Sequence, residues 1–184
     1  MKTLYLFLLT LLVAIGARAA TPIRGVCQVD STAMTAFVRQ YNPNFDPAIA
    51  RAFHEIGNRY GIRGDIALCQ AILETGWFRF DNGTAVAPSQ HNYCGMGVIK
   101  TGDSGCNFES VEAGVTALIQ HLYAYCCSDE LPEGEVIIDP RYKLVKRGSA
   151  PCWEDLVGRW AMNTAYAVNI LINYERLTRH AGNR

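Results

Sequence analysis

Apolar side chains recur at helical spacing along most of the chain beyond residue 30. The clearest stripe runs over residues 49–60, where large apolar side chains follow one another at intervals of four, three and four residues. This spacing places them on one face of a helix. Asp46 followed by Pro47 is typical of a helix start, and Gly61 is typical of a helix end. The pattern therefore predicts a helix between these signals.

Similar patterns predict further helices over residues 32–41, from residue 64 to about 74, from Ser110 onwards, near 153–157 and over about 164–179. The segment 64–74 is apolar nearly all round, so we expect this helix to lie in the middle of the domain. Residues 79–108 are rich in Gly, Asn, Ser and Asp, which indicates a long loop region with a small hairpin near 98–100 and 105–108. The predicted fold is mainly α, with five or six helices, a central buried helix and a small loop or β-hairpin lobe.

The first residues have the pattern of an export signal. Lys2 precedes an apolar run over residues 4–15, and the sequence ARA at 17–19 fits a small-x-small cleavage site. We expect a cleavable signal peptide over residues 1–19 and a secreted or periplasmic mature protein. The apolar run is short for a membrane-spanning helix, and no second run of spanning length follows it, so no stable membrane span is expected after cleavage.

Composition limits the function classes. The chain has 184 residues, of which 49% are hydrophobic and 18% are charged, and this suits one domain with a real core. The formal net charge is zero. A nucleic-acid binder would carry a basic excess, so no nucleic-acid partner is expected.

Seven cysteines in an exported chain suggest disulfides, with at least one thiol left over. Cys94 and Cys106 bracket a Gly-rich loop and are the first candidate pair. Cys126 or Cys127 with Cys152 is the second. Cys69 lies in the apolar segment 64–74 and is expected to be a buried thiol.

Glu74 is the candidate for acid chemistry. It ends an almost wholly apolar segment and is followed closely by Trp77. A charged side chain in such a place is costly unless it is paired or used. Desolvation would raise its pKa and keep a proton on the carboxyl group, as a general acid requires.

The residues around Glu74 carry a resemblance to a known family. Residues 70–77 (QAILETGW) resemble the Q-A-x-L-E-[ST]-G-W core of bacterial glucosaminidase domains. Residues 91–97 (HNYCGMG), 108–115 (FESVEAGV) and 160–167 (WAMNTAYA) are similar to three further motifs of that family, in the same order. The resemblance covers roughly residues 47–178, after a lead-in with a first helix over residues 20–46.

The resemblance implies a lysozyme-like helical fold and cleavage of glycans at β-linked N-acetylglucosamine, chiefly in peptidoglycan. It implies that Glu74 is the catalytic general acid, which protonates the leaving glycosidic oxygen. Tyr166 matches the tyrosine of the last motif, which lines the cleft. The residues expected to bind substrate by the same resemblance are Gln70, Trp77, Asn92, Tyr93 and Asn163.

The second catalytic group is open at this point. A retaining enzyme needs a second carboxylate about 5 Å from the first, and an inverting enzyme needs one about 6.5–9.5 Å away. Asp103 is the acid within the short predicted hairpin, and Glu109 and Asp81 are the other candidates. Participation by the acetamido group of the substrate would need none of them.

The leading hypothesis is a secreted, monomeric endo-β-N-acetylglucosaminidase that cleaves β-1,4 bonds of peptidoglycan. A lytic transglycosylase or a muramidase on the same fold is an alternative, and so is a non-catalytic protein that binds cell-wall glycan. The four histidines do not cluster at ligand spacings, and acid catalysis needs no metal, so no metal or cofactor is expected.

Overall fold

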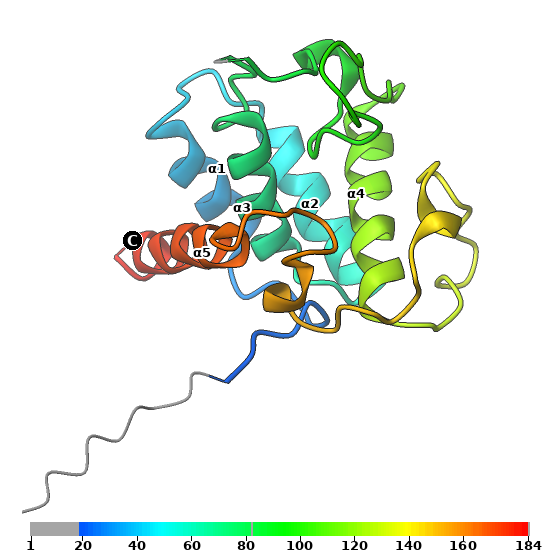
Figure 1. The fold of residues 1–184 in the computed structure, drawn as a ribbon. Helices are drawn as coiled ribbons and strands as arrows, with labels where there is room; N and C mark the ends of the chain where they lie inside the picture. The colour runs from blue at the N-terminus through cyan, green and yellow to red at the C-terminus, as the bar shows by residue number, and fades with distance from the viewer. Residues whose placement is uncertain (1–18, 82, 184) are drawn as a thin grey trace, which may run out of the picture.

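The computed structural model describes residues 19–81 and 83–183. Within these residues the chain forms five α-helices, which Figure 1 shows around a common centre. They are α1 (Ser31–Arg39), α2 (Pro47–Tyr60), α3 (Gly64–Thr75), α4 (Val111–Cys126) and α5 (Tyr166–Gly182). The predicted mainly α, lysozyme-like class is confirmed.

Local capping sets the helix boundaries. The Asp46 side chain accepts a hydrogen bond from the Ala48 N–H at 2.8 Å, and Gly61 ends α2 in the left-handed conformation, with φ of 62°. The Ser110 hydroxyl caps α4 in the same way, through the Ala113 N–H at 3.1 Å. The predicted limits of α2 and the predicted start of α4 are therefore confirmed.

Helix α3 lies at the centre of the molecule, as its all-round apolar sequence predicted. It packs against α2 on one side and α5 on another, while α2 also contacts α1 and α4 (Figure 1). Nearly every side chain of α3 is buried, including Ile66 and Leu68, which are fully inaccessible. The exceptions lie in its last turn, where Leu73 and Glu74 retain contact with solvent.

The connection from α3 to α4 is a loop lobe at one end of the helices (Figure 1). It contains one short 3-10 helix, Pro88–Gln90, and the hairpin predicted near residues 98–108 is not formed by these described residues. The chain there makes turns, one of which is closed by the Cys106 N–H donating to the Met96 carbonyl at 2.7 Å. Glycines at positive φ, such as Gly102 at 96°, interrupt any extended strand.

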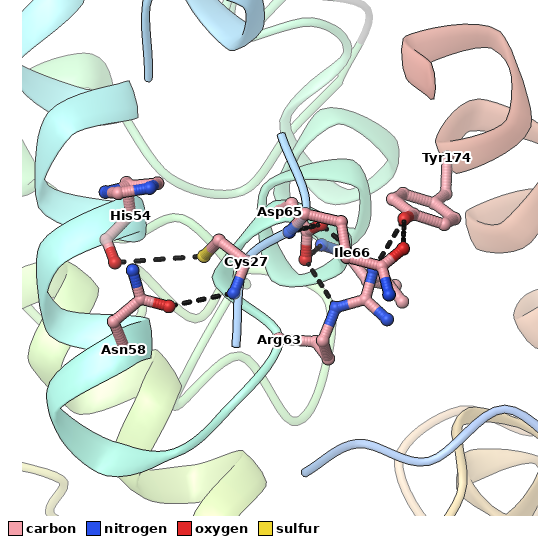
Figure 2. A network of polar contacts seen from close by, with 8 residues as sticks. Cys27, His54, Asn58, Arg63, Asp65, Ile66 and Tyr174 are labelled. Atoms are coloured by element: carbon pink, nitrogen blue, oxygen red, sulfur yellow. Dashed lines mark hydrogen bonds and ion pairs between the residues drawn. The ribbon is translucent and has the colours of Figure 1, made fainter. Parts of the chain in front are cut away.

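A polar network holds the N-terminal segment against the helices (Figure 2). Asp65, in the first turn of α3, is fully buried and accepts hydrogen bonds from the Arg63 guanidinium at 2.9 Å. The same carboxylate accepts from the Gln28 N–H at 2.8 Å. Arg63 also donates to the hydroxyl of Tyr174 on α5 at 2.6 Å. One buried ion pair therefore joins three separate parts of the chain.

The export signal predicted over residues 1–19 lies, apart from Ala19, outside the described residues. In the part of the chain that is described, no helix has both the length and the apolar character needed to cross a bilayer.

The expected disulfides are not formed, since all seven cysteines are free thiols. The thiols of Cys126 and Cys127 both point to the carbonyl of Tyr123, at 3.6 and 3.5 Å, so neither is bonded to Cys152. The Cys94–Cys106 pair is absent as well. Cys69 is fully buried, as its position in the apolar segment predicted.

Candidate active site

Glu74 lines a cleft of about 500 Å³ between the helices and the loop lobe. The loop lobe supplies residues 84–86 and 94–99 to one wall. Helix α4 supplies His121 and Tyr125 to the opposite wall. The later part of the chain supplies Arg141, Arg159 and Trp160 to it. The volume is within the range of small-molecule sites.

The carboxyl group of Glu74 is held by the first residue of α5. The Tyr166 hydroxyl donates a hydrogen bond to Glu74 Oε1 at 2.5 Å, and the Gln70 amide donates to the same hydroxyl oxygen at 2.8 Å. Because Gln70 occupies one side of that oxygen, the tyrosine proton is directed towards Glu74. Gln70, Glu74 and Tyr166 were all expected in the site from the sequence, and they meet here.

Burial and hydrogen bonding act on Glu74 in opposite directions. Desolvation raises its pKa, while hydrogen bonding from Tyr166 and from the Trp160 side chain lowers it, and the net effect is a raised pKa. The pKa of Tyr166 is also raised, by burial and by the neighbouring Glu74 carboxylate. Tyr166 therefore stays a protonated donor at neutral pH.

An unusual turn follows α3 and directs the chain away from Glu74. Gly76, Trp77 and Phe78 all have positive φ, which is costly for the two aromatic residues, and the side-chain amide of Asn42 donates to the carbonyls of both, at 3.1 and 3.2 Å. Trp77 stacks on Tyr41 with ring centroids 3.8 Å apart. Trp77, which was expected to bind substrate, is not among the described residues that line the cleft.

Asn92 and Tyr93 support the loop lobe and do not line the cleft. Asn92 is fully buried, and its amide donates to the carbonyls of Met96 and Cys106 at 2.9 and 3.0 Å. It thereby fixes the shape of the loop whose residues 94–99 form the cleft wall. Tyr93 is 2% exposed and packs edge-on to Phe53, so it is a core aromatic residue. Neither residue is among those that line the cleft with Glu74.

Asn163 also has a local role in the structure. It is exposed and its side chain accepts a hydrogen bond from the Ala165 N–H at 2.9 Å, just before α5. This bond shapes the turn that brings Tyr166 to Glu74, and Asn163 itself does not line the cleft.

No candidate for a second carboxylate lines the cleft. Asp103 accepts hydrogen bonds from the N–H groups of Ile99 and Lys100, both at 2.9 Å, and so closes its own turn. Glu109 is exposed before α4, and Asp81 pairs with an arginine at 3.2 Å. Of the described residues that line the cleft, Glu74 is the one with a carboxyl group. Nor do three His, Cys, Asp or Glu side chains gather as a metal site would need anywhere in the described ranges.

Sequence reasoning missed two parts of the cleft wall. One is Trp160, which lines the cleft. It is the first residue of the motif at 160–167, so its position in that motif could have indicated a place in the site. His121 on α4 packs edge-on to that ring, with centroids 4.9 Å apart, and its Nδ1 lies 2.7 Å from a carboxylate oxygen of the buried Asp139. His121 and Asp139 are 18 positions apart, and no local pattern predicts that they pair.

Comparisons with known proteins agree with this geometry. The family described as mannosyl-glycoprotein endo-beta-N-acetylglucosaminidase (glucosaminidase) matches residues 50–178. An uncharacterized protein of Borreliella burgdorferi is 35% identical over 147 residues, which are 78% of this chain and 69% of that protein. No solved structure matches the chain.

Proposed function

This chain belongs to the glucosaminidase family, and we propose that it is a secreted endo-β-N-acetylglucosaminidase of peptidoglycan with Glu74 as its general acid. Membership supports the broader statement that it is a glycoside hydrolase acting on a peptidoglycan-like glycan. The bond cleaved and the role of Glu74 are our inference from the site.

The observation that carries the proposal is the environment of one carboxyl group. Glu74 faces a cleft large enough for sugar rings, and burial raises its pKa. A carboxylic acid that keeps its proton near neutral pH can protonate a glycosidic oxygen. Trp160 lies in the same cleft wall, and its aromatic ring offers a face on which a sugar can stack.

The neighbours of Glu74 suit both halves of the proton transfer. Before the transfer, desolvation favours the protonated acid. After the transfer, the carboxylate accepts the hydrogen bond from Tyr166, which is itself oriented by Gln70. We propose that Tyr166 and Gln70 thereby position the acid and stabilise its conjugate base, and that Asn92 acts indirectly, by shaping the loop wall.

We propose that the acetamido group of the substrate replaces a second carboxylate. Its oxygen attacks the anomeric carbon while the glycosidic bond breaks and the leaving oxygen takes the proton of Glu74. Water then attacks the same carbon and gives its proton to the Glu74 carboxylate. The bond from that carbon to the acetamido oxygen breaks, which restores the acetamido group, and the two displacements together retain the anomeric configuration. The absence of a second acid among the described cleft-lining residues supports this mechanism.

The remaining parts of the proposal concern the whole chain. We propose that residues 1–19 direct export, that residues 20–46 form a lead-in, and that residues 47–178 form the catalytic domain. The mature protein is then a monomer that works outside the cytoplasm on cell-wall glycan. Its acid mechanism requires no metal.

Product analysis on purified peptidoglycan tests the proposal. The wild type should release fragments that end in a reducing N-acetylglucosamine, with one added water per cut, as measured by mass spectrometry. Glu74→Gln should reduce the rate at least a hundredfold, since amides do not act as general acids at neutral pH. Glu130→Gln removes an exposed carboxylate away from the cleft and is the matched control.

Each other outcome has a defined meaning. Full activity of Glu74→Gln would contradict the assignment of the acid. A large rate loss in Asp103→Asn or Glu109→Gln would contradict acetamido participation. A reducing N-acetylmuramic acid would identify a muramidase, and wall binding without new reducing ends would identify a glycan-binding protein.

A lytic transglycosylase is the second candidate, because it also works with a single acid. In that case the carboxylate left on Glu74 would take a proton from a hydroxyl of the sugar itself, which closes an anhydro ring. Mass spectrometry separates the two reactions, because the anhydro product is lighter than the hydrolysis product by one water.

A further inference from the structure

A second hollow adjoins the cleft on the side away from the loop lobe. It has a volume of about 250 Å³ and shares four lining residues with the cleft, which are His121, Tyr125, Arg141 and Arg159. A glycan that lies across Glu74 can therefore extend a substituent past these side chains into the hollow. Its outer wall is formed by residues 144–146 and Ser149, which follow the segment that runs beside α4 (Figure 1).

The walls of this hollow carry positive charge without a balancing acid. Arg141, Lys146 and Arg159 line it, and no Asp or Glu is among the described residues that do so. Neither arginine forms an ion pair with a described residue. Arg159 donates from Nη1 to the Asp155 carbonyl at 2.8 Å, a contact that orients its guanidinium without neutralising it.

A buried carboxylate contacts two of the residues that line this hollow. Asp139 is 1% exposed, and its two oxygens contact His121 Nδ1 at 2.7 Å and the backbone N–H of Arg141 at 2.8 Å. It therefore fixes the segment that carries Arg141, while the Arg141 side chain stays half-buried and available in the hollow.

Arg141 and Arg159 both line the cleft and the hollow, so they lie where the two spaces join. Tyr125 lines the same two spaces. Burial and the Asp139 carboxylate raise its pKa, whereas the charges of Arg141 and Arg159 lower it. Two guanidinium groups at this junction are suited to bind a carboxylate, which accepts hydrogen bonds from their paired N–H groups.

We propose that Arg141 and Arg159 form a carboxylate-binding subsite, so that the substrate is an anionic glycan and not a neutral one. The glycan itself rests on the proposed function. The carboxylate belongs either to an acidic sugar or to a peptide attached to it, and both present the same group to the arginines. A neutral N-acetylglucosamine polymer fills the cleft beside Glu74 and leaves the subsite empty.

Binding measurements with three soluble ligands of equal glycan length test the subsite. The first is a neutral N-acetylglucosamine tetrasaccharide, the second is an alternating tetrasaccharide with free lactyl carboxylates, and the third carries peptides on those lactyl groups. Dissociation constants are measured by calorimetry in the Glu74→Gln background, where turnover does not interfere. The subsite predicts that at least one carboxylate-bearing ligand binds more tightly than the neutral one, and which of the two does so identifies the source of the carboxylate.

Two substitutions then remove the charges. Arg141→Gln and Arg159→Gln should each raise the dissociation constant of the preferred anionic ligand on the order of tenfold, because each removes a charge-assisted hydrogen bond. Both arginines also line the cleft, so the neutral ligand should lose some affinity, but clearly less than the anionic ligand. An unchanged urea unfolding midpoint shows that each variant is folded. Lys143→Ala removes an exposed charge from the same segment, outside the hollow, and should alter neither constant. Raising the salt concentration should weaken the anionic ligands only.

Equal affinity of the wild-type subsite for all three ligands, or equal losses for neutral and anionic ligands in the arginine variants, would overturn the proposal. These outcomes differ from a failure of the proposed function, which would show as undiminished cleavage by Glu74→Gln or as no cleavage by the wild type. Arginine-dependent anion binding in a protein that does not cleave would retain the subsite and reject the enzyme.

Discussion

In the mechanism that we propose, the carboxyl group of Glu74 must first keep a proton and then release it, and its neighbours serve both needs. Burial favours the neutral acid, and the hydroxyl of Tyr166 favours the anion. Tyr166 cannot take the proton itself, because its own pKa is raised well above the ordinary value. The contact between the two residues therefore sets the pH at which the acid is lost.

Replacing Tyr166 by phenylalanine should separate these effects. Tyr166→Phe removes the donor that favours the Glu74 carboxylate, so the pKa of Glu74 rises and the acid survives to higher pH. The fall in rate on the alkaline side of the pH profile should move to higher pH, measured as kcat on soluble glycan. At the optimum, kcat should fall about tenfold to a hundredfold, since the anion formed in the reaction loses one hydrogen bond.

Tyr142→Phe is the control for that experiment. Tyr142 is buried, and its hydroxyl has no hydrogen-bond partner among the described residues, so the rate and the pH profile should stay unchanged. A lower kcat for Tyr166→Phe with an unmoved alkaline limb would mean that the tyrosine is only a packing residue.

Sequence information at the residue scale was sufficient for the centre of the site and insufficient for its walls. Gln70 and Glu74 lie four positions apart on one helix, so a local motif brings them together. Trp77 lies only three positions further on. The positive φ values from Gly76 to Phe78 nevertheless turn the chain, and the Trp77 ring stacks on Tyr41. His121 and Asp139 meet through tertiary packing, which no local pattern encodes.

At the scale of elements, helices with strong end signals were predicted well. The caps of α2 and α4 involve residues only two or three positions away, so the information is local. The loop lobe was harder to predict because its shape depends on buried contacts of Asn92 with carbonyls four and fourteen positions away. Gly-rich turns there replaced the expected hairpin.

Helix α4 packs against the loop lobe at one glycine, and this contact positions the cleft wall. A Cβ atom at Gly114 would lie 1.8 Å from the carbonyl oxygen of His91. Gly114→Ala should therefore separate the helix from the lobe and lower the free energy of unfolding by about 1–3 kcal/mol. Urea denaturation measures this change, and cleavage should fall too, because residues 94–99 move with His91.

Gly182→Ala provides the comparison. A Cβ at this position of α5 meets no atom within 4 Å, and alanine is the better helix former, so the stability should stay equal or rise slightly. If Gly114→Ala were equally harmless, the close approach of α4 to the lobe would not be required for the fold.

At the scale of the whole molecule, the segment before α1 joins parts of the chain that are far apart in sequence. The Cys27 N–H donates to Asn58 on α2 at 2.8 Å, and the next residue donates to Asp65 on α3 (Figure 2). Through Arg63 the same network reaches Tyr174 on α5. These contacts hold α3 and α5 together at the end opposite the loop lobe, and so they support the meeting of Glu74 with Tyr166.

Asp65→Asn tests whether this network stabilises the fold as one unit. The substitution leaves the buried Arg63 guanidinium without its anion, which should cost about 3–5 kcal/mol of unfolding free energy in urea titrations. Asp129→Asn breaks the exposed ion pair with Arg24 at 2.7 Å and should cost less than about 1 kcal/mol. Arg24 lies in the N-terminal segment and Arg63 contacts it, so both substitutions break an ion pair of that segment. Similar losses of stability for the two would show that the buried pair has no special part in docking the segment.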